Sequence, residues 1–249
     1  MCLIVFAWQL DPARPLVVAA NRDEFHARPA RPFGAWPDLP GIHAGRDLEA
    51  GGTWMGLGSG GRFAALTNIR DPSQPVGRRS RGELASAYLA GAVSPDDYLE
   101  DVASRLEDYS GFNLLVGDQE SLWHLNARTG TPRKLAPGVY GVSNADLDTP
   151  WPKLARSKAT FKDAWRMAST DPLFALLADR TVPPDEALPK TGVSLPLERL
   201  LSSAFIVSPD YGTRVSTVVE RRGDGIFHVE ERQFDRDGKR MGTVSWVGR

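Results

Sequence analysis

The side chain best suited to covalent chemistry is the thiol of Cys2, close to the start of the chain. Methionine aminopeptidase removes Met1 when residue 2 is small, and cysteine qualifies, so we expect Cys2 to become the first residue. The freed α-amine has an unperturbed pKa of about 7.7–8.0, which lets it act as a general base near neutral pH. Because a thiolate is an effective nucleophile in acyl transfer, one residue would then supply both nucleophile and base.

Two apolar segments determine what lies beside this thiol. Residues 2–8 and 16–20 are apolar throughout, which is typical of strands buried on both faces. The Asp-Pro and Arg-Pro steps between them predict a turn, and hence a hairpin. With the turn centred near Pro12, the numbers of paired residues sum to roughly 24 or 25. We therefore expect the thiol to lie opposite residue 22 or 23.

The second of these strands ends in four polar residues, Asn21, Arg22, Asp23 and Glu24. Side chains alternate along a strand, so Asn21 and Asp23 share one face, and Arg22 and Glu24 share the other. Asp23 would hold or orient the α-amine, and Arg22 would favour the thiolate of Cys2. The register leaves open which of the two faces Cys2. A buried cysteine and a polar strand end are each common without any function, but their adjacency favours an active site.

Composition and charge exclude several other classes of function. The chain has 249 residues, of which 41% are hydrophobic and 24% charged, and this fits a single domain spanning 1–249. A net charge of −1 gives no general attraction for nucleic acid or acidic membranes. The single cysteine excludes an internal disulfide and a multi-thiolate metal site. The apolar start is too short for a membrane span or a signal peptide, so we expect a cytoplasmic protein.

The remaining elements predict an α+β fold. The segment 21–52 is rich in proline, glycine and charge, and we interpret it as a long functional loop. Apolar strands with helices segregated from them indicate two stacked sheets between helical layers. Helices are expected at 81–90, from Ser94 onward, and at 151–167, 171–179 and 197–203; further strands are expected at 53–57, 62–67, 112–117, 121–126, 138–143, 214–221, 226–234 and 242–247.

A combination of short motifs covers nearly the whole chain and resembles the NRDE family, also called the transport-and-Golgi-organisation-2 family. Each motif is weakly specific alone, but the set is highly specific. The motifs are Met1-Cys2 before an apolar strand, 20–24 (ANRDE) with Arg28-Pro29, 50–56 (AGGTWMG), 66–70 (LTNIR), 80–82 (SRG), 111–114 (GFNL), 141–144 (GVSN) with 151–153 (WPK), and 211–214 (YGTR).

The resemblance implies a four-layer αββα sandwich of the N-terminal-nucleophile (Ntn) hydrolase type, similar to choloylglycine-type amidohydrolases. In those enzymes a strand ends in an Asn and an Asp, a later Asn helps to form the oxyanion hole, another Asn follows, and an Arg comes near the C-terminal third. Carried over, Asn21 and Asp23 match the strand-end pair, Asn68 the oxyanion residue and Asn144 the later Asn. Arg214 is a looser match for the Arg.

Together these features predict an amidohydrolase-like protein acting on an amide or thioester bond of a small molecule. Cys2 would be the nucleophile, and the amides of Asn68 and Asn144 would bind the developing oxyanion. Glu24, Thr67, Trp54 and Arg214 are the expected substrate-binding residues. One difference from the hydrolases is that Ala20 occupies the place of their Arg before the Asn.

A non-catalytic carrier of haem, lipid or acyl-CoA is the alternative function, because the family is implicated in haem trafficking and lipid homeostasis and fold does not dictate function. His26, His43, His124 or Cys2 would then be candidate axial ligands of a carried haem. The basic residues 78–81 would hold a carboxylate, phosphate or propionate. No helical His-x-x-x-His spacing is present, so we expect no metal site and no resident cofactor.

Overall fold

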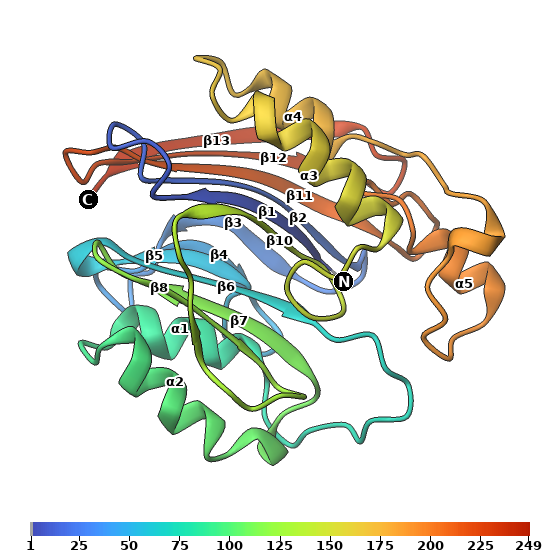
Figure 1. Cartoon of the computed structure of the whole chain (residues 1–249), viewed down its shortest axis with the longest axis horizontal. Coiled ribbons are helices and arrows are strands. Elements are labelled where there is room, and N and C mark those ends of the chain that lie inside the picture. Colours follow the sequence, from blue (N-terminus) through green and yellow to red (C-terminus); the bar gives the residue numbers. More distant parts are fainter. Residues whose placement is uncertain (1) are drawn as a thin grey trace.

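Two antiparallel sheets face each other in the computed structural model, which describes residues 2–249 (Figure 1). The expected removal of Met1 therefore lies outside the described residues. In spatial order, the first sheet contains β10 (Gly138–Val142), β1 (Cys2–Trp8), β2 (Leu16–Phe25), β11 (Tyr211–Arg221), β12 (Phe227–Phe234) and β13 (Arg240–Gly248). The second contains β3 (Ala30–Ala35), β4 (His43–Asp47), β5 (Met55–Gly58), β6 (Arg62–Asn68), β7 (Phe112–Gly117), β8 (Leu122–Asn126) and β9 (Arg133–Lys134).

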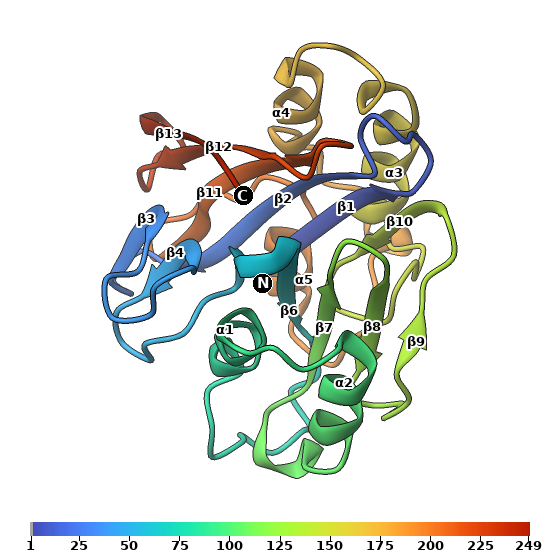
Figure 2. The same cartoon turned by 90° about the vertical axis from the view of Figure 1, so that its left-hand side faces the viewer.

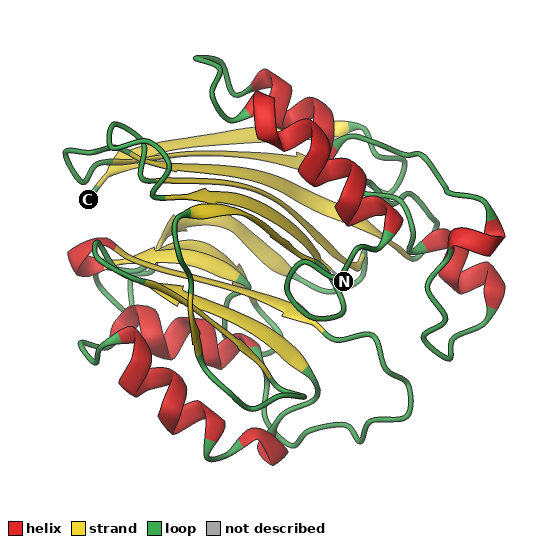
Figure 3. Ribbon diagram, viewed as in Figure 1, coloured by secondary structure: helices red, strands yellow, loops and turns green. Residues whose placement is uncertain are grey.

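Helices cover the outer face of each sheet, so the predicted αββα sandwich is confirmed (Figures 2 and 3). Helices α3 (Pro152–Ala164) and α4 (Asp171–Leu177) pack on the first sheet, and α1 (Gly82–Ala90) and α2 (Pro95–Ala103) pack on the second. A short helix, α5 (Leu195–Leu200), lies to one side of the sandwich. No helix in the described chain is long and apolar enough to cross a membrane.

Strand β1 is apolar at every position because both of its faces are buried. Ile4 and Phe6 belong to the hydrophobic cluster between the sheets, whereas Leu3 and Val5 belong to the cluster under α3 and α4. Burial of an aliphatic or aromatic side chain of this size stabilises a fold by about 1.5–3 kcal/mol. Cys2, two residues before Ile4, has its side chain on the same inner face.

The predicted hairpin register is confirmed. Strands β1 and β2 pair antiparallel with Cys2 opposite Arg22 and Leu3 opposite Asn21. Ala20 lies in the inter-sheet cluster, so the alternation of β2 places Arg22 on the same inner face as Cys2. The choice that the sequence left open is thereby resolved in favour of Arg22.

The expected long loop at 21–52 is wrong. Strand β2 continues through the polar residues to Phe25, and β3 and β4 follow within the segment. Strand β3 is at the edge of its sheet and largely exposed, so it lacks an apolar pattern and tolerates Pro32. The predicted helix start at Ser94 is confirmed, because its side chain accepts a hydrogen bond from the backbone of Asp97.

Candidate active site

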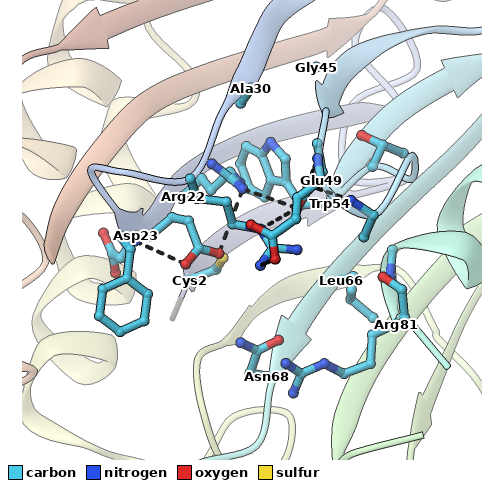
Figure 4. Close-up of a pocket in the computed structure, with 18 of the residues that line it drawn as sticks. Cys2, Arg22, Asp23, Ala30, Gly45, Glu49, Trp54, Leu66, Asn68 and Arg81 are labelled. Carbon is cyan, nitrogen blue, oxygen red and sulfur yellow. Dashed lines mark hydrogen bonds and ion pairs between the residues drawn. The ribbon is translucent and has the colours of Figure 1, made fainter. Parts of the chain in front are cut away.

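Cys2 lies at the wall of a cavity between the strand ends of the two sheets. Cys2 is 7% exposed, and the cavity has a volume of about 830 Å³. Arg22 and Asp23 of β2, Trp54 before β5 and Asn68 at the end of β6 also line it (Figure 4). The volume is within the usual range for a small-molecule site. The ends of strands from both sheets thus bring the predicted nucleophile and its polar neighbours to one cavity.

Opposing influences act on the Cys2 thiol. Burial raises its pKa, because desolvation disfavours the thiolate, and the charge of Asp23 raises it further. The positive charge of Arg22 and a hydrogen bond from the backbone N–H of Asp23 lower it, but burial outweighs them and the pKa of the thiol stays above its ordinary value. Arg22 Nη2 is 3.6 Å from Glu24 Oε2 and 3.7 Å from Asp47 Oδ2, so neighbouring carboxylates hold the guanidinium in place beside the thiol.

Asp23 is buried behind the thiol, on the opposite face of β2 from Arg22. The hydroxyl of Thr213 donates a 2.6 Å hydrogen bond to its Oδ1, and the hydroxyl of Tyr211 donates to its backbone oxygen at 2.9 Å. Burial raises the pKa of Asp23, whereas the positive charge of Lys153 and the Thr213 hydrogen bond lower it. The carboxylate is therefore fixed in one orientation beside the start of β1.

Asn21 is fully buried but does not line the cavity. Its Nδ2 donates to the carbonyl oxygens of Leu177, at 2.8 Å, and Ala204, at 2.7 Å, while Ser216 donates to its Oδ1 at 2.6 Å. These bonds tie β2 to the end of α4 and to the chain before β11. Asn21 is therefore next to Arg22 in β2, but its side chain makes interior hydrogen bonds and does not face the cavity.

The two remaining asparagines take different positions. Asn68 lines the cavity, and its side-chain amide makes no hydrogen bond within the described residues. Asn144 does not line this cavity; its Nδ2 donates to the backbone oxygen of Asn68 at 2.9 Å. Its neighbour Ser143 donates to the backbone oxygen of Cys2 at 3.2 Å. Asn144 thus braces Asn68, whose own amide is available to a ligand.

The four predicted substrate-binding residues divide evenly. Glu24 and Trp54 line the cavity, whereas Thr67 and Arg214 do not. Thr67 is buried and accepts a 3.1 Å hydrogen bond from Asn113 Nδ2. Arg214 Nη1 donates to three carbonyls at and just beyond the end of β2, those of residues 25, 26 and 28, at 2.9–3.2 Å. It therefore fixes the loop that follows the polar cluster.

Sequence reasoning missed Lys153, which is only 2% exposed. Burial lowers its pKa to about 8, while the negative charge of Asp23 opposes the shift. Its Nζ donates to the backbone oxygen of Leu201 at 3.0 Å. The sequence feature that could have indicated Lys153 is the Trp-Pro-Lys motif at the start of α3. The family resemblance included this motif but assigned no role to the lysine.

None of the histidines lines the cavity. His26, His43 and His124 do not line it, so Cys2 is the one candidate haem ligand from the sequence that does. His124 is buried against Asn113, and burial lowers its pKa to about 4. Across residues 2–249 no group of three or more histidine, cysteine, aspartate or glutamate residues is arranged to hold a metal ion.

Two solved structures share this fold. One is a Caenorhabditis elegans ortholog of N-acylethanolamine-hydrolyzing acid amidase, with a TM-score of 0.52, 11% identity, and coverage of 87% of this chain and 92% of that one. The other is a mutant conjugated bile acid hydrolase from Clostridium perfringens, with a TM-score of 0.53, 9% identity, and coverage of 99% and 96%. The fold is thus of the Ntn-hydrolase type.

Sequence relatives extend over almost the entire length. The chain is 36% identical over 257 aligned residues to the Transport and Golgi organization protein 2 homolog of Bos taurus, covering 94% of this chain and 93% of that protein. It is 33% identical over 261 aligned residues to the human homolog, covering 95% of each. A sequence model of the family Transport and Golgi organisation 2 matches residues 1–236. The chain therefore belongs to the Transport and Golgi organisation 2 family.

Proposed function

We propose that this protein is an N-terminal-cysteine amidohydrolase-like enzyme that cleaves an amide or thioester bond of a small molecule. The observation that carries the proposal is the position of Cys2, which pairs with Arg22 and lines a cavity of about 830 Å³ together with Asp23 and Asn68. This constellation contains a nucleophile, a cation that favours its thiolate and a free amide donor. The fold shared with two hydrolases supports it as an analogy only.

In the proposed reaction, removal of Met1 frees the α-amine of Cys2, which takes the proton of its own thiol. The thiolate attacks the carbonyl carbon, and the negative charge that develops on the carbonyl oxygen accepts a hydrogen bond from Asn68. The bond to nitrogen or sulfur breaks, and the α-ammonium returns the proton to the leaving group. Water then cleaves the acyl-thioester, which releases the acid and restores the thiol.

Asp23 and Arg22 have complementary roles in this scheme. The buried carboxylate of Asp23, oriented by Thr213, would hold the α-ammonium that forms during attack. Arg22 lowers the pKa of the Cys2 thiol and so counteracts the effect of burial. Asn21 and Asn144 act indirectly, through the hydrogen bonds that fix β2 and Asn68.

Alkylation of the single cysteine tests this proposal. At neutral pH, iodoacetamide should label Cys2 faster in the trimmed chain than in a matched chain that carries an uncleavable extension before Cys2, because only the trimmed chain has an α-amine on Cys2 that can take the proton of the thiol. Both chains are labelled in the folded state, so burial of Cys2 affects them equally. Equal labelling rates in the two chains would contradict an activated nucleophile.

A carrier of a hydrophobic anion, such as haem or acyl-CoA, is the second candidate function. One observation favours it: the arginines of segment 78–81 and the leucines of the α5 segment line the same cavity. A carrier would release its ligand chemically unchanged, and an acyl-CoA, which needs no axial ligand, would bind equally well after Cys2→Ala. Recovery of intact acyl-CoA after incubation with the native chain, together with equal binding by Cys2→Ala, separates this function from catalysis.

A further inference from the structure

The cavity contains one substantially covered arginine without a carboxylate partner. Seven arginines line it, and five of them form ion pairs within 4 Å, for example Arg28 with Asp47 and Arg78 with Asp108. Arg31 has no such partner but is exposed. Within residues 2–249, Arg81 is half-buried and has no acidic side chain at salt-bridge distance. Burying a cation without a counter-ion is unfavourable in free energy, so this part of the cavity wall is suited to binding an anion.

The structure fixes Arg81 in position without neutralising it. Its Nη1 donates to the backbone oxygen of Gly111 at 3.2 Å, an oxygen that also accepts from the backbone N–H of Ile69. Burial lowers the pKa of Arg81, while the charges of Cys2 and Glu24 raise it, so the guanidinium is close enough to both to respond to them. Arginine stays protonated in this environment. The remaining N–H groups of its fork are free for a planar anion.

The position of Arg81 relates it to the reacting centre. In Figure 4 its side chain reaches from the start of α1 towards the part of the cavity that Asn68 also lines. Asn68 is the donor proposed for the carbonyl oxygen of the substrate. An anion on Arg81 would therefore lie close to the scissile bond, as the carboxylate of an amino acid does when its amine is acylated.

An apolar wall accompanies this cation. Leu197, Leu200 and Leu201, in or directly after α5, line the same cavity, and Leu197 is exposed there. The Arg70–Glu198 ion pair anchors α5 to the chain after β6. An aliphatic chain against these leucines would remove its own and their surface from water, which is favourable by about 25 cal/mol per Å².

We propose that Arg81 is the anion receptor of this cavity, and that its ligands are acyl compounds carrying a carboxylate near the acyl carbonyl, of the class of N-acyl amino acids with an aliphatic acyl chain. The inference rests on the proposed function for the identity of the reacting bond. It concerns binding, however, so it is testable without turnover. Arg81 acts here as a specificity-determining residue.

The experiment measures binding to the Cys2→Ala chain by isothermal titration calorimetry. The probes are N-lauroylglycine and its neutral carboxamide, N-lauroylglycinamide, both below their micelle-forming concentrations. We expect the carboxylate to bind at least about tenfold more tightly, which corresponds to 1.4 kcal/mol. In Arg81→Gln this preference should fall to less than about twofold, while Arg81→Lys should restore part of it.

Arg46→Gln is the matched control, because it removes the same charge from the lining of the same cavity. Both Nη atoms of Arg46 donate to the carboxylate of Asp38, so the preference for the carboxylate probe should persist in this variant. Thermal unfolding of each variant checks that the fold is retained. Equal affinity for both probes, no measurable binding of the carboxylate, or an unchanged preference in Arg81→Gln would overturn the inference. Because Cys2 is absent, a failure of catalysis alone leaves the expected binding preference intact.

Discussion

The buried ion pair behind the apolar wall of the cavity gives a quantitative prediction. Arg70 Nη1 is 2.5 Å from Glu198 Oε2, and the two side chains are only 4% and 5% exposed. Glu198 also accepts hydrogen bonds from the backbone and hydroxyl of Thr191, and Arg70 donates to the backbone oxygen of Leu201. Two contacts from Arg70 thus attach the α5 segment to the chain after β6, and two hydrogen bonds from Thr191 hold the Glu198 carboxylate in place.

Glu198→Gln keeps the shape of the side chain but removes its charge. Arg70 would then lose the charge of its Glu198 partner, and removing one partner of such a buried pair costs about 3–5 kcal/mol. For a chain of this size, each kcal/mol lowers the melting temperature by about 2–4 °C, so we expect a decrease of roughly 6–20 °C. Circular dichroism during heating at neutral pH measures this change.

Two further variants complete the design. Asp185→Asn breaks the exposed pair between Asp185 and Arg199 in the same segment and should change the melting temperature far less, because exposed pairs contribute little. The double variant Arg70→Met with Glu198→Leu should recover much of the loss, because it leaves no uncompensated charge. If Glu198→Gln lowers the melting temperature no more than Asp185→Asn does, the buried pair does not anchor the α5 segment.

Two other predictions concern titratable groups. Arg22→Gln should raise the pKa of the Cys2 thiol, because Arg22 lowers it in the native chain; the pH at which alkylation becomes half-maximal should therefore move upward, and an unchanged profile would rule out this role. His124 has a pKa of about 4 in the fold, below its usual value near 6.5, so the unfolded chain binds a proton there before the folded chain does. The native chain should consequently lose stability as pH falls from 6.5 towards 4, and His124→Gln should lose less in urea titrations over that window; equal losses would refute the assignment.

The sequence predicted the nucleophile and its hairpin because local information was sufficient there. Two short apolar runs separated by proline-containing turns determine the pairing register to within one residue. In the structure, Cys2 lies opposite Arg22. The helix that begins at Ser94 was predictable for the same reason, because a capping hydroxyl and a following proline act within one turn. The layered architecture followed from strands that are apolar on both faces.

Contacts between distant parts of the chain were not predictable in this way. Asn21 is hydrogen-bonded to residues 177 and 204, and nothing in the local sequence distinguishes such a packing asparagine from one that faces a cavity. Lys153 is buried through its position at the start of α3, although lysine is ordinarily exposed. The edge strand β3 escaped detection because exposure removes the apolar alternation on which strand prediction depends.

The central claim is that Cys2 is the first residue of the mature chain. Intact-mass spectrometry of the purified protein, followed by sequencing of its terminal peptide, tests this claim most directly. The account predicts a mass lower by one methionine residue and a terminal peptide that begins at Cys2. A chain that retains Met1 after expression with an active methionine aminopeptidase would contradict the account, since the α-amine would then belong to a different residue from the thiol.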